Sequence, residues 1–168
     1  NIVDVIYLSD EDNFKKESFV NKYFVFKTNL FQKYLYSFFQ FFKLKPLQTG
    51  FFYSKKMKKK IDQIKSNYDV IICHLSRSSI YLPESFDGSK ILEMTDIISK
   101  NYLQRSENVS FLNMLKYLYL LESKFLARFE QEIINKFNSV VLVSKEKNFF
   151  SKEKLKKVKI IPNGINKV

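Results

Sequence analysis

Short apolar runs alternate with longer amphipathic stretches along the chain, which is typical of an α/β domain built on a parallel sheet. Some runs, such as residues 70–72 and 140–143, are almost continuously apolar, as is usual for strands covered on both faces. The pattern predicts strands at residues 2–8, 23–27, 69–74, 90–95, 139–144 and 158–161.

Three stretches between these strands have the apolar spacing of amphipathic helices. Residues 30–43 gather apolar side chains on one face, namely Phe31, Leu35, Phe38 and Phe42. Residues 54–66 carry apolar side chains inward and a row of lysines outward. Residues 110–137 repeat apolar residues at spacings of three, four and seven, with Glu122 as an interruption: Phe111, Leu115, Leu118, Phe125, Phe129, Ile133 and Phe137.

The length of 168 residues and the 45% hydrophobic content fit a single domain over residues 1–168 and exclude a disordered polar tail. Cys73 is the only cysteine and His74 the only histidine, so a disulfide framework and a His/Cys metal cluster are excluded, and we expect no metal. No apolar run reaches the roughly 18 residues that cross a bilayer.

The net charge of +12 suggests an anionic partner. Part of the lysine excess reflects the composition of an AT-rich coding sequence, because only three basic residues are arginines. No nucleic-acid motif is present and the lysines are spread along the chain, so we expect a membrane surface or a phosphorylated ligand rather than nucleic acid. The membrane-facing candidates are Phe38, Phe42, Lys58 and Lys59. The alternative is that the aromatic face of residues 30–43 packs on the sheet.

Candidate chemistry stands at the carboxyl ends of the predicted strands, where open parallel sheets bind ligands. These positions are His74 and Arg77, Asp96, Ser144 and Lys145, and then Asn163 and Gly164. The glycine-rich phosphate loops of dinucleotide enzymes and P-loop NTPases are absent. Two alternatives stay open: His74 as a structural hydrogen-bonding residue, and Asp96 as the cap of a following helix.

Several segments in order resemble the N-terminal domain of GT-B glycosyltransferases of the group 1 family. The resemblance covers residues 68–74, 90–102, 119–122, 128–130, 136–144 and 160–166, and the last of these reads Ile-Ile-Pro-Asn-Gly-Ile-Asn. The family implies a Rossmann-like, mostly parallel sheet flanked by helices, which binds the saccharide or lipid-linked acceptor. A C-terminal domain, absent here, holds the nucleotide-sugar donor.

The resemblance assigns roles to individual residues. Asp96 stands at the catalytic position near the transferred sugar, and Asn163 and Gly164 stand at the crossing to the donor domain. The acceptor-binding positions are His74, Arg77, Ser144 and Lys145. For three further residues we expect buried or interfacial ion pairing: Arg105, Glu122 and Glu130. The family implies retaining hexosyl transfer in cell-surface polysaccharide synthesis, with no cofactor besides the donor, in the cytoplasm or on the inner face of the plasma membrane.

The chain departs from the family at both ends. It starts at the family's second strand, so we predict a sheet that lacks the first strand and is divided between residues 2–8 and 69–74. We therefore expect a fragment, or another segment in the gap, and no transferase activity from this part alone. Two alternatives are a non-catalytic Rossmann-like interaction domain and, less favoured, a basic nucleic-acid-binding module.

Overall fold

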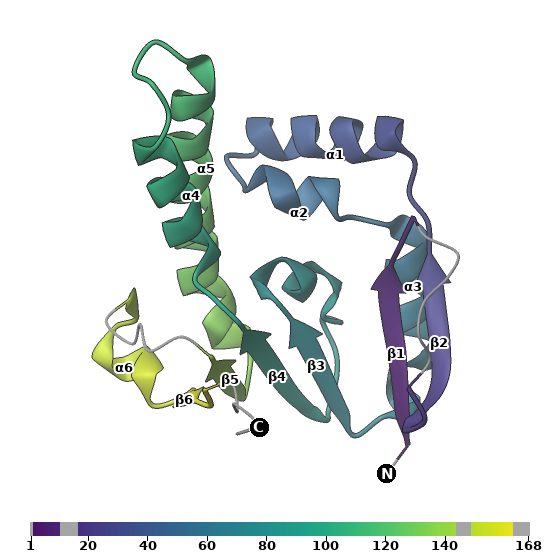
Figure 1. Ribbon diagram of the computed structural model, residues 1–168. Helices are drawn as coiled ribbons and strands as arrows, with labels where there is room; N and C mark the ends of the chain where they lie inside the picture. Colours follow the sequence, from purple (N-terminus) through teal and green to yellow (C-terminus); the bar gives the residue numbers. More distant parts are fainter. Residues whose placement is uncertain (1, 11–16, 144–148, 163–168) are drawn as a thin grey trace, which may run out of the picture.

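A computed structural model describes residues 2–10, 17–143 and 149–162, and it has the predicted α/β architecture with parallel strands (Figure 1). One sheet pairs β1 (Val3–Leu8) with β2 (Val20–Phe26). The other has the order β3 (Val70–His74), β4 (Ser89–Met94), β5 (Ser139–Leu142) and β6 (Val158–Ile160). All of these strand pairs are parallel, so the Rossmann-like fold class is confirmed.

The division of the sheet falls where the sequence predicts it. Among the described residues, β1 pairs only with β2, and β3 pairs only with β4. A side-chain bond links the two sheets, because the Tyr68 hydroxyl donates to the Asp4 carboxylate. This hydrogen bond is the main reason that the pKa of Asp4 lies below its usual value, and burial raises the pKa of Tyr68 to about 12.

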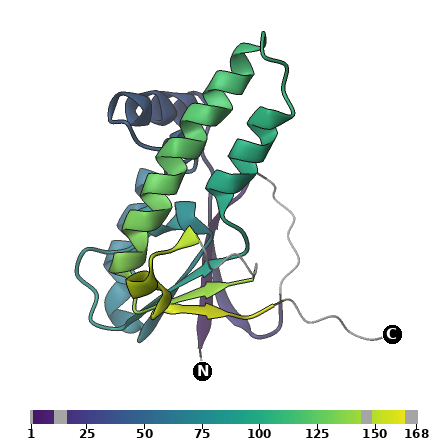
Figure 2. The ribbon, with the colours of Figure 1, turned by 90° about the vertical axis from the view of Figure 1, so that its left-hand side faces the viewer.

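The helices lie on one side of the strands and above their carboxyl ends (Figures 1 and 2). The α-helices are α1 (Leu30–Phe42), α2 (Leu47–Phe51), α3 (Lys55–Ile64), α4 (Ile98–Glu107), α5 (Met114–Ile133) and α6 (Lys152–Leu155). The described residues also include the 3-10 turns η1 (Lys65–Asn67), η2 (Ser76–Tyr81) and η3 (Ile134–Lys136). Asn29 and Asn113 cap α1 and α5 by accepting from backbone N–H groups.

The core lies on one face of the four-stranded sheet. Fully buried side chains of β4 and β5 pack there against the end of α5 and η3: Leu92, Met94, Val140, Leu142, Ile133, Ile134 and Phe137. On the opposite face of β3, Ile72 is 65% exposed and Val70 is also exposed. The expectation of strands covered on both faces is therefore wrong for β3 in the described part of the chain.

The helical face predicted for residues 110–137 is only partly correct. The helix begins at Met114, and its first half extends beyond the sheet as a hairpin with α4 (Figure 2). Phe111 and Leu115 are consequently exposed. The buried face instead includes Glu122 and Glu130, which the hydrophobic pattern treats as interruptions.

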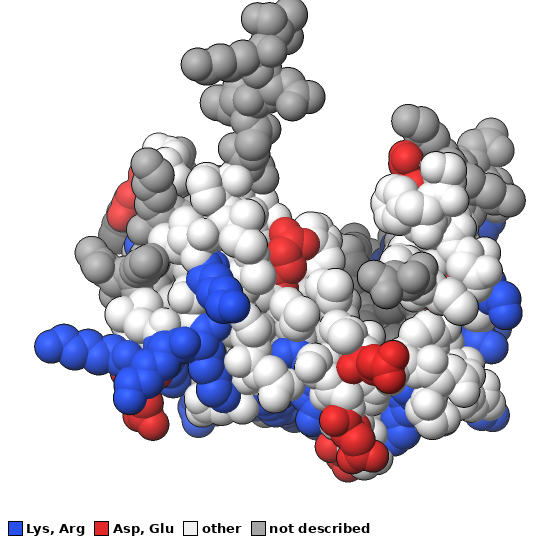
Figure 3. Space-filling model, turned by 90° about the horizontal axis from the view of Figure 1, so that it is seen from below, with Lys and Arg blue, Asp and Glu red and all other residues white. Residues whose placement is uncertain are grey.

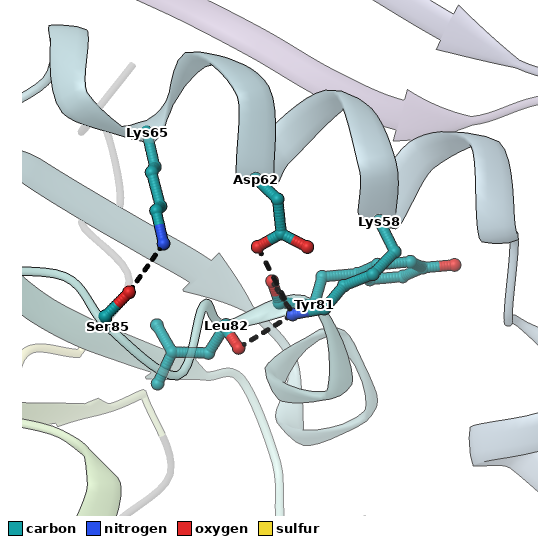
Figure 4. Close-up of polar contacts among 6 residues, drawn as sticks. All are labelled: Lys58, Asp62, Lys65, Tyr81, Leu82 and Ser85. Atoms are coloured by element: carbon teal, nitrogen blue, oxygen red, sulfur yellow. Dashed lines mark hydrogen bonds and ion pairs between the residues drawn. The ribbon is translucent and has the colours of Figure 1, made fainter.

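Lys58 has a structural role that the sequence does not predict. Its ammonium group lies against η2 and donates to the backbone carbonyls of Leu82 at 3.0 Å and Tyr81 at 3.3 Å (Figure 4). It also lies 3.9 Å from the carboxylate of Asp62 on its own helix. This placement removes Lys58 from the membrane-facing candidates, whereas Lys59 is exposed.

Candidate functional site

A cavity of about 240 Å³ lies beyond the carboxyl ends of β3 and β4. It brings together residues from α2, the segments after β3 and β4, and α4: Gln48, Leu75, Arg77, Asp96, Ile98, Asn101, Tyr102 and Arg105. This is the edge at which open parallel sheets bind ligands. Two of the residues predicted from strand position, Arg77 and Asp96, therefore meet in one polar cavity.

Asp96 is exposed in this cavity and does not cap the helix that follows it. The first N–H groups of α4 are bound instead by the buried carboxylate of Glu130, which accepts from Ile98 N at 2.9 Å and from Ser99 N at 3.4 Å. The Ser99 hydroxyl also donates to Glu130, at 2.6 Å. The Asp96 carboxylate has no hydrogen bond or ion pair within the described residues, so it is available to a ligand.

The role of Glu130 makes stability depend on pH. Burial raises the pKa of Glu130 to about 7, against 4.5 for the free side chain. Between these two values the folded protein keeps the Glu130 proton, whereas the unfolded chain has lost it. Proton binding by Glu130 therefore stabilises the folded state fully at low pH, and this contribution is lost as the pH rises through 7. From pH 5 to 8 we expect a loss of about 2 to 3 kcal/mol in the free energy of unfolding.

Urea unfolding of Glu130→Gln, which stays neutral, is expected to show a weaker pH dependence than the wild type. The exposed neighbour Glu132 provides the control, since Glu132→Gln should leave the dependence unchanged. If the free energy of unfolding of Glu130→Gln changed with pH as steeply as that of the wild type, Glu130 would not be the source of the pH dependence.

Arg77 reaches the cavity from η2 and is half-buried. Its guanidinium lies 4.3 Å from the centroid of the Phe52 ring, and its Nη1 donates to Gln48 Oε1 at 3.4 Å. Burial lowers its pKa. No carboxylate pairs with Arg77 in the described part of the chain, so its positive charge is available to an anionic ligand group.

The backbone that precedes Arg77 is held in an uncommon conformation. Leu75 has φ 66° and ψ 150°, a region that residues other than glycine rarely occupy. Its N–H donates to Glu93 O at 2.7 Å, and its side chain lines the cavity. The strained residue therefore sits at the turn that directs η2 and Arg77 into the site.

One face of α4 supplies the opposite wall. Asn101 and Tyr102 lie three and four residues after Ile98, and Arg105 lies four and three residues after them, which places all four on the same side of the helix. Arg105 lies 5.6 Å from the Tyr102 ring and forms no ion pair within the described residues. The expected ion pairing of Arg105 is thus wrong, and the helical spacing was the signal that would have identified this face.

Gln48 completes the cavity from α2. It is 8% exposed, and its Nε2 has no hydrogen-bonding partner in the described part of the chain. Glu122 of α5 fixes the start of α2 by accepting from Leu47 N at 2.8 Å and Gln48 N at 3.1 Å. Glu122 and Glu130 therefore bind helix N-termini and form no ion pair with any described residue, which corrects the expectation for both.

The remaining predicted residues do not join the cavity. His74 pairs through Nδ1 with the carboxylate of Glu93, its register partner on the neighbouring strand β4, and its side chain is mostly exposed. The structure thus favours the structural alternative for His74. Four predicted residues lie outside the described residues: Ser144, Lys145, Asn163 and Gly164. Within the described ranges, no cluster of three or more His, Cys, Asp or Glu residues forms a metal site.

A second cavity, of about 690 Å³, lies at the carboxyl ends of β1 and β2. Its lining combines one acidic residue with lysines and neutral polar side chains: Asp10, Lys27, Thr28, Asn29, Gln32, Tyr36, Ser54, Lys55, Lys56 and Lys59. Lys59 thus lines this cavity together with Gln32 and Tyr36 of α1. The exposed Phe38 and Phe42 are considered below with the rest of that helix.

Comparison of the sequence with protein-family models gives no match, and comparison with curated proteins gives none. Neither comparison bears on the resemblance to glycosyltransferases, which stays a prediction.

Proposed function

We propose that the chain is the acceptor-binding part of a retaining glycosyltransferase of the GT-B type. The observation that carries this proposal is the meeting of Asp96 and Arg77 in one cavity at the carboxyl ends of β3 and β4. The family resemblance assigned both residues to the site, and the Rossmann-like class fits the same family. A nucleotide-sugar, bound by a separate C-terminal domain, is the proposed donor, and we expect no further cofactor.

The side chains of the cavity suit an acceptor that carries both hydroxyl and anionic groups. Arg77 and Arg105 offer two guanidinium groups that no carboxylate of the described ranges pairs with, and such groups bind phosphate through paired hydrogen bonds. The amide groups of Gln48 and Asn101 suit sugar hydroxyls. The exposed Asp96 carboxylate accepts a hydrogen bond from a hydroxyl of the sugar and holds it at the reacting end.

The test is transfer by the full-length protein from UDP-glucose, UDP-galactose and UDP-N-acetylglucosamine to saccharide acceptors, with the anomeric configuration of the product read by NMR. Asp96→Asn is expected to lower kcat about a hundredfold with little change in acceptor KM. Arg77→Lys is expected to raise the KM of a phosphorylated acceptor about tenfold, because lysine cannot reproduce the paired hydrogen bonds.

Exposed residues away from the cavity provide matched controls. Asp87→Asn and Arg128→Lys should leave both constants unchanged, since neither residue lines the cavity. Inversion at the anomeric carbon, or equal losses for Asp96→Asn and Asp87→Asn, would refute the assignment.

A second candidate function is a non-catalytic interaction domain, favoured by the exposed apolar face of β3. Ile72 and Val70 are both exposed there, and an apolar strand surface of this kind suits another polypeptide. Two results would favour this function over the first. The wild type would neither transfer nor bind a saccharide, and it would form a complex with another polypeptide that Ile72→Ser disrupts.

A further inference from the structure

The helix α1 turns most of its apolar side chains outward. None of its thirteen residues is buried, and Phe42 is 66% exposed. Its exposed apolar residues surround much of the helix: Leu30, Phe31, Tyr34, Leu35, Phe38, Phe39, Phe41 and Phe42. The alternative that this aromatic face packs on the sheet is therefore wrong. The helix packs on α2 instead, where the Tyr34 and Phe51 rings meet edge to face.

A second exposed apolar group lies at the tip of the α4–α5 hairpin. Leu112 is 89% exposed and Met114 is 86% exposed. Their exposed apolar neighbours extend along the hairpin: Leu103, Phe111, Leu115, Tyr117 and Leu118. Figure 1 shows this tip and α1 at the same end of the molecule, beyond the carboxyl ends of the strands. We call α1 and the tip together the apolar end.

Lysine predominates among the charged residues of α1 and of the segment that follows it. Residues 30–45, which contain α1, include three lysines and no aspartate or glutamate. Residues 108–121, which contain the tip, include one lysine and no acidic residue. Lys43 and Lys45, immediately after α1, are exposed. Asp10 contacts α1 through its ion pair with Lys33, at 2.6 Å, and Glu107 is exposed at the end of α4. An apolar surface bordered mainly by lysine matches the interface of a bilayer that contains anionic lipid.

We propose that the apolar end binds the surface of an anionic lipid bilayer. With thirteen residues, α1 is about 20 Å long, which suits a helix lying in the plane of the interface. Within the described residues, no helix is long and apolar enough to span a membrane. The aromatic side chains of α1 and the leucine and methionine side chains of the tip enter the boundary between headgroups and acyl chains, and the lysines bind lipid phosphates.

The arrangement places the acceptor cavity between the two parts of the apolar end. One wall comes from α2, which packs on α1, and the other comes from α4, which packs on α5. A bilayer at this end would present a lipid-linked acceptor to Arg77 and Arg105. Membrane binding does not require the transfer reaction, so it can be tested independently of the proposed function.

Co-sedimentation with vesicles tests the proposal. The purified chain is mixed with vesicles of phosphatidylcholine, with and without phosphatidylglycerol. We expect binding only where the anionic lipid is present, and weaker binding at high salt. Phe38→Ser/Phe42→Ser on α1 and Leu112→Ser/Met114→Ser at the tip should each weaken binding about tenfold. These side chains are exposed, so the variants should unfold at the same urea concentration as the wild type.

Matched controls show whether binding depends on the apolar end itself or on any exposed apolar or charged residue. Phe19→Ser removes a similarly exposed phenylalanine at the start of β2, at the opposite end of the molecule, and should not affect binding. Lys43→Glu/Lys45→Glu should weaken binding, whereas Lys152→Glu/Lys156→Glu should not. The latter pair lies in the region of α6, where blue side chains stand out in the view from below (Figure 3).

Three outcomes would overturn the proposal. They are no binding to anionic vesicles, equal loss in Phe19→Ser, and a wild-type dimer that Phe38→Ser/Phe42→Ser dissociates without any vesicle binding. The last outcome would assign the apolar end to a second copy of the chain. Arg77→Ala distinguishes the two proposals, because it should impair acceptor use while vesicle binding stays unchanged.

Discussion

Replacement of Glu130 by alanine is expected to lower the free energy of unfolding by about 3 kcal/mol. Glu130 is completely buried and accepts hydrogen bonds from the N–H groups of Ile98 and Ser99 and from the Ser99 hydroxyl. Alanine would leave these donors unsatisfied inside the protein and would open a cavity between α4 and α5. The start of α4 would lose the acceptor that takes the place of a side-chain cap, because its N-cap residue is Ile97.

Chemical denaturation at a pH near 5 measures this loss, because the stabilising contribution of Glu130 is near its maximum there. Glu132→Ala on the same helix is the control, since Glu132 is exposed and pairs only with Arg128 among the described residues. A loss of the same size in Glu132→Ala would show that the effect comes from helix propensity. Because α4 carries Asn101 and Arg105, fraying of its first turn should also weaken binding of the proposed saccharide acceptor.

The strands follow from sequence for a physical reason. Parallel strands that are buried in a sheet have nearly continuous apolar runs. Residues 139–144 and 158–161 contain such runs. The structure accordingly places β5 and β6 within these ranges. The start of β2 was less clear, because exposed Asn21 and Lys22 belong to the strand but interrupt its apolar pattern.

The site could be predicted only in part. Asp96 and Arg77 follow strands, and the carboxyl ends of parallel strands meet at one edge, so topology alone places them together. Gln48 could not be found in this way, because its position depends on Glu122, which lies 74 residues further along the chain. The same holds for Glu130, whose carboxylate reaches the start of another helix.

The charged residues on the buried face of α5 show why the hydrophobic pattern misled. Glu122 and Glu130 are eight residues apart, so both lie on one side of the helix, and each accepts from the N-terminus of a different helix. A pattern that counts only apolar residues assigns this side to solvent.

Gly50→Ala is expected to destabilise the packing of α1 on α2 by roughly 2 to 3 kcal/mol. A Cβ atom at Gly50 would lie 2.4 Å from the carbonyl carbon and oxygen of Tyr36 and 2.5 Å from the backbone nitrogen of Ser37. These are backbone atoms of α1, so no side-chain rotation relieves the overlap and the whole helix must shift. The shift would also break the bond from the Ser37 hydroxyl to Leu47 O, now 3.1 Å.

The damage should be local, because the core on the four-stranded sheet contains no residue of α1. Hydrogen exchange is therefore the suitable measurement: amides of α1 should exchange faster in Gly50→Ala, while those of β4 and β5 keep their protection. Gly50→Ala/Tyr36→Ala should bring no recovery, since the overlap involves the backbone. Unchanged exchange in α1, or recovery in the double variant, would show that α1 does not depend on this close approach. If the membrane proposal is correct, the same loosening should weaken vesicle binding through α1 without altering the tip of the α4–α5 hairpin.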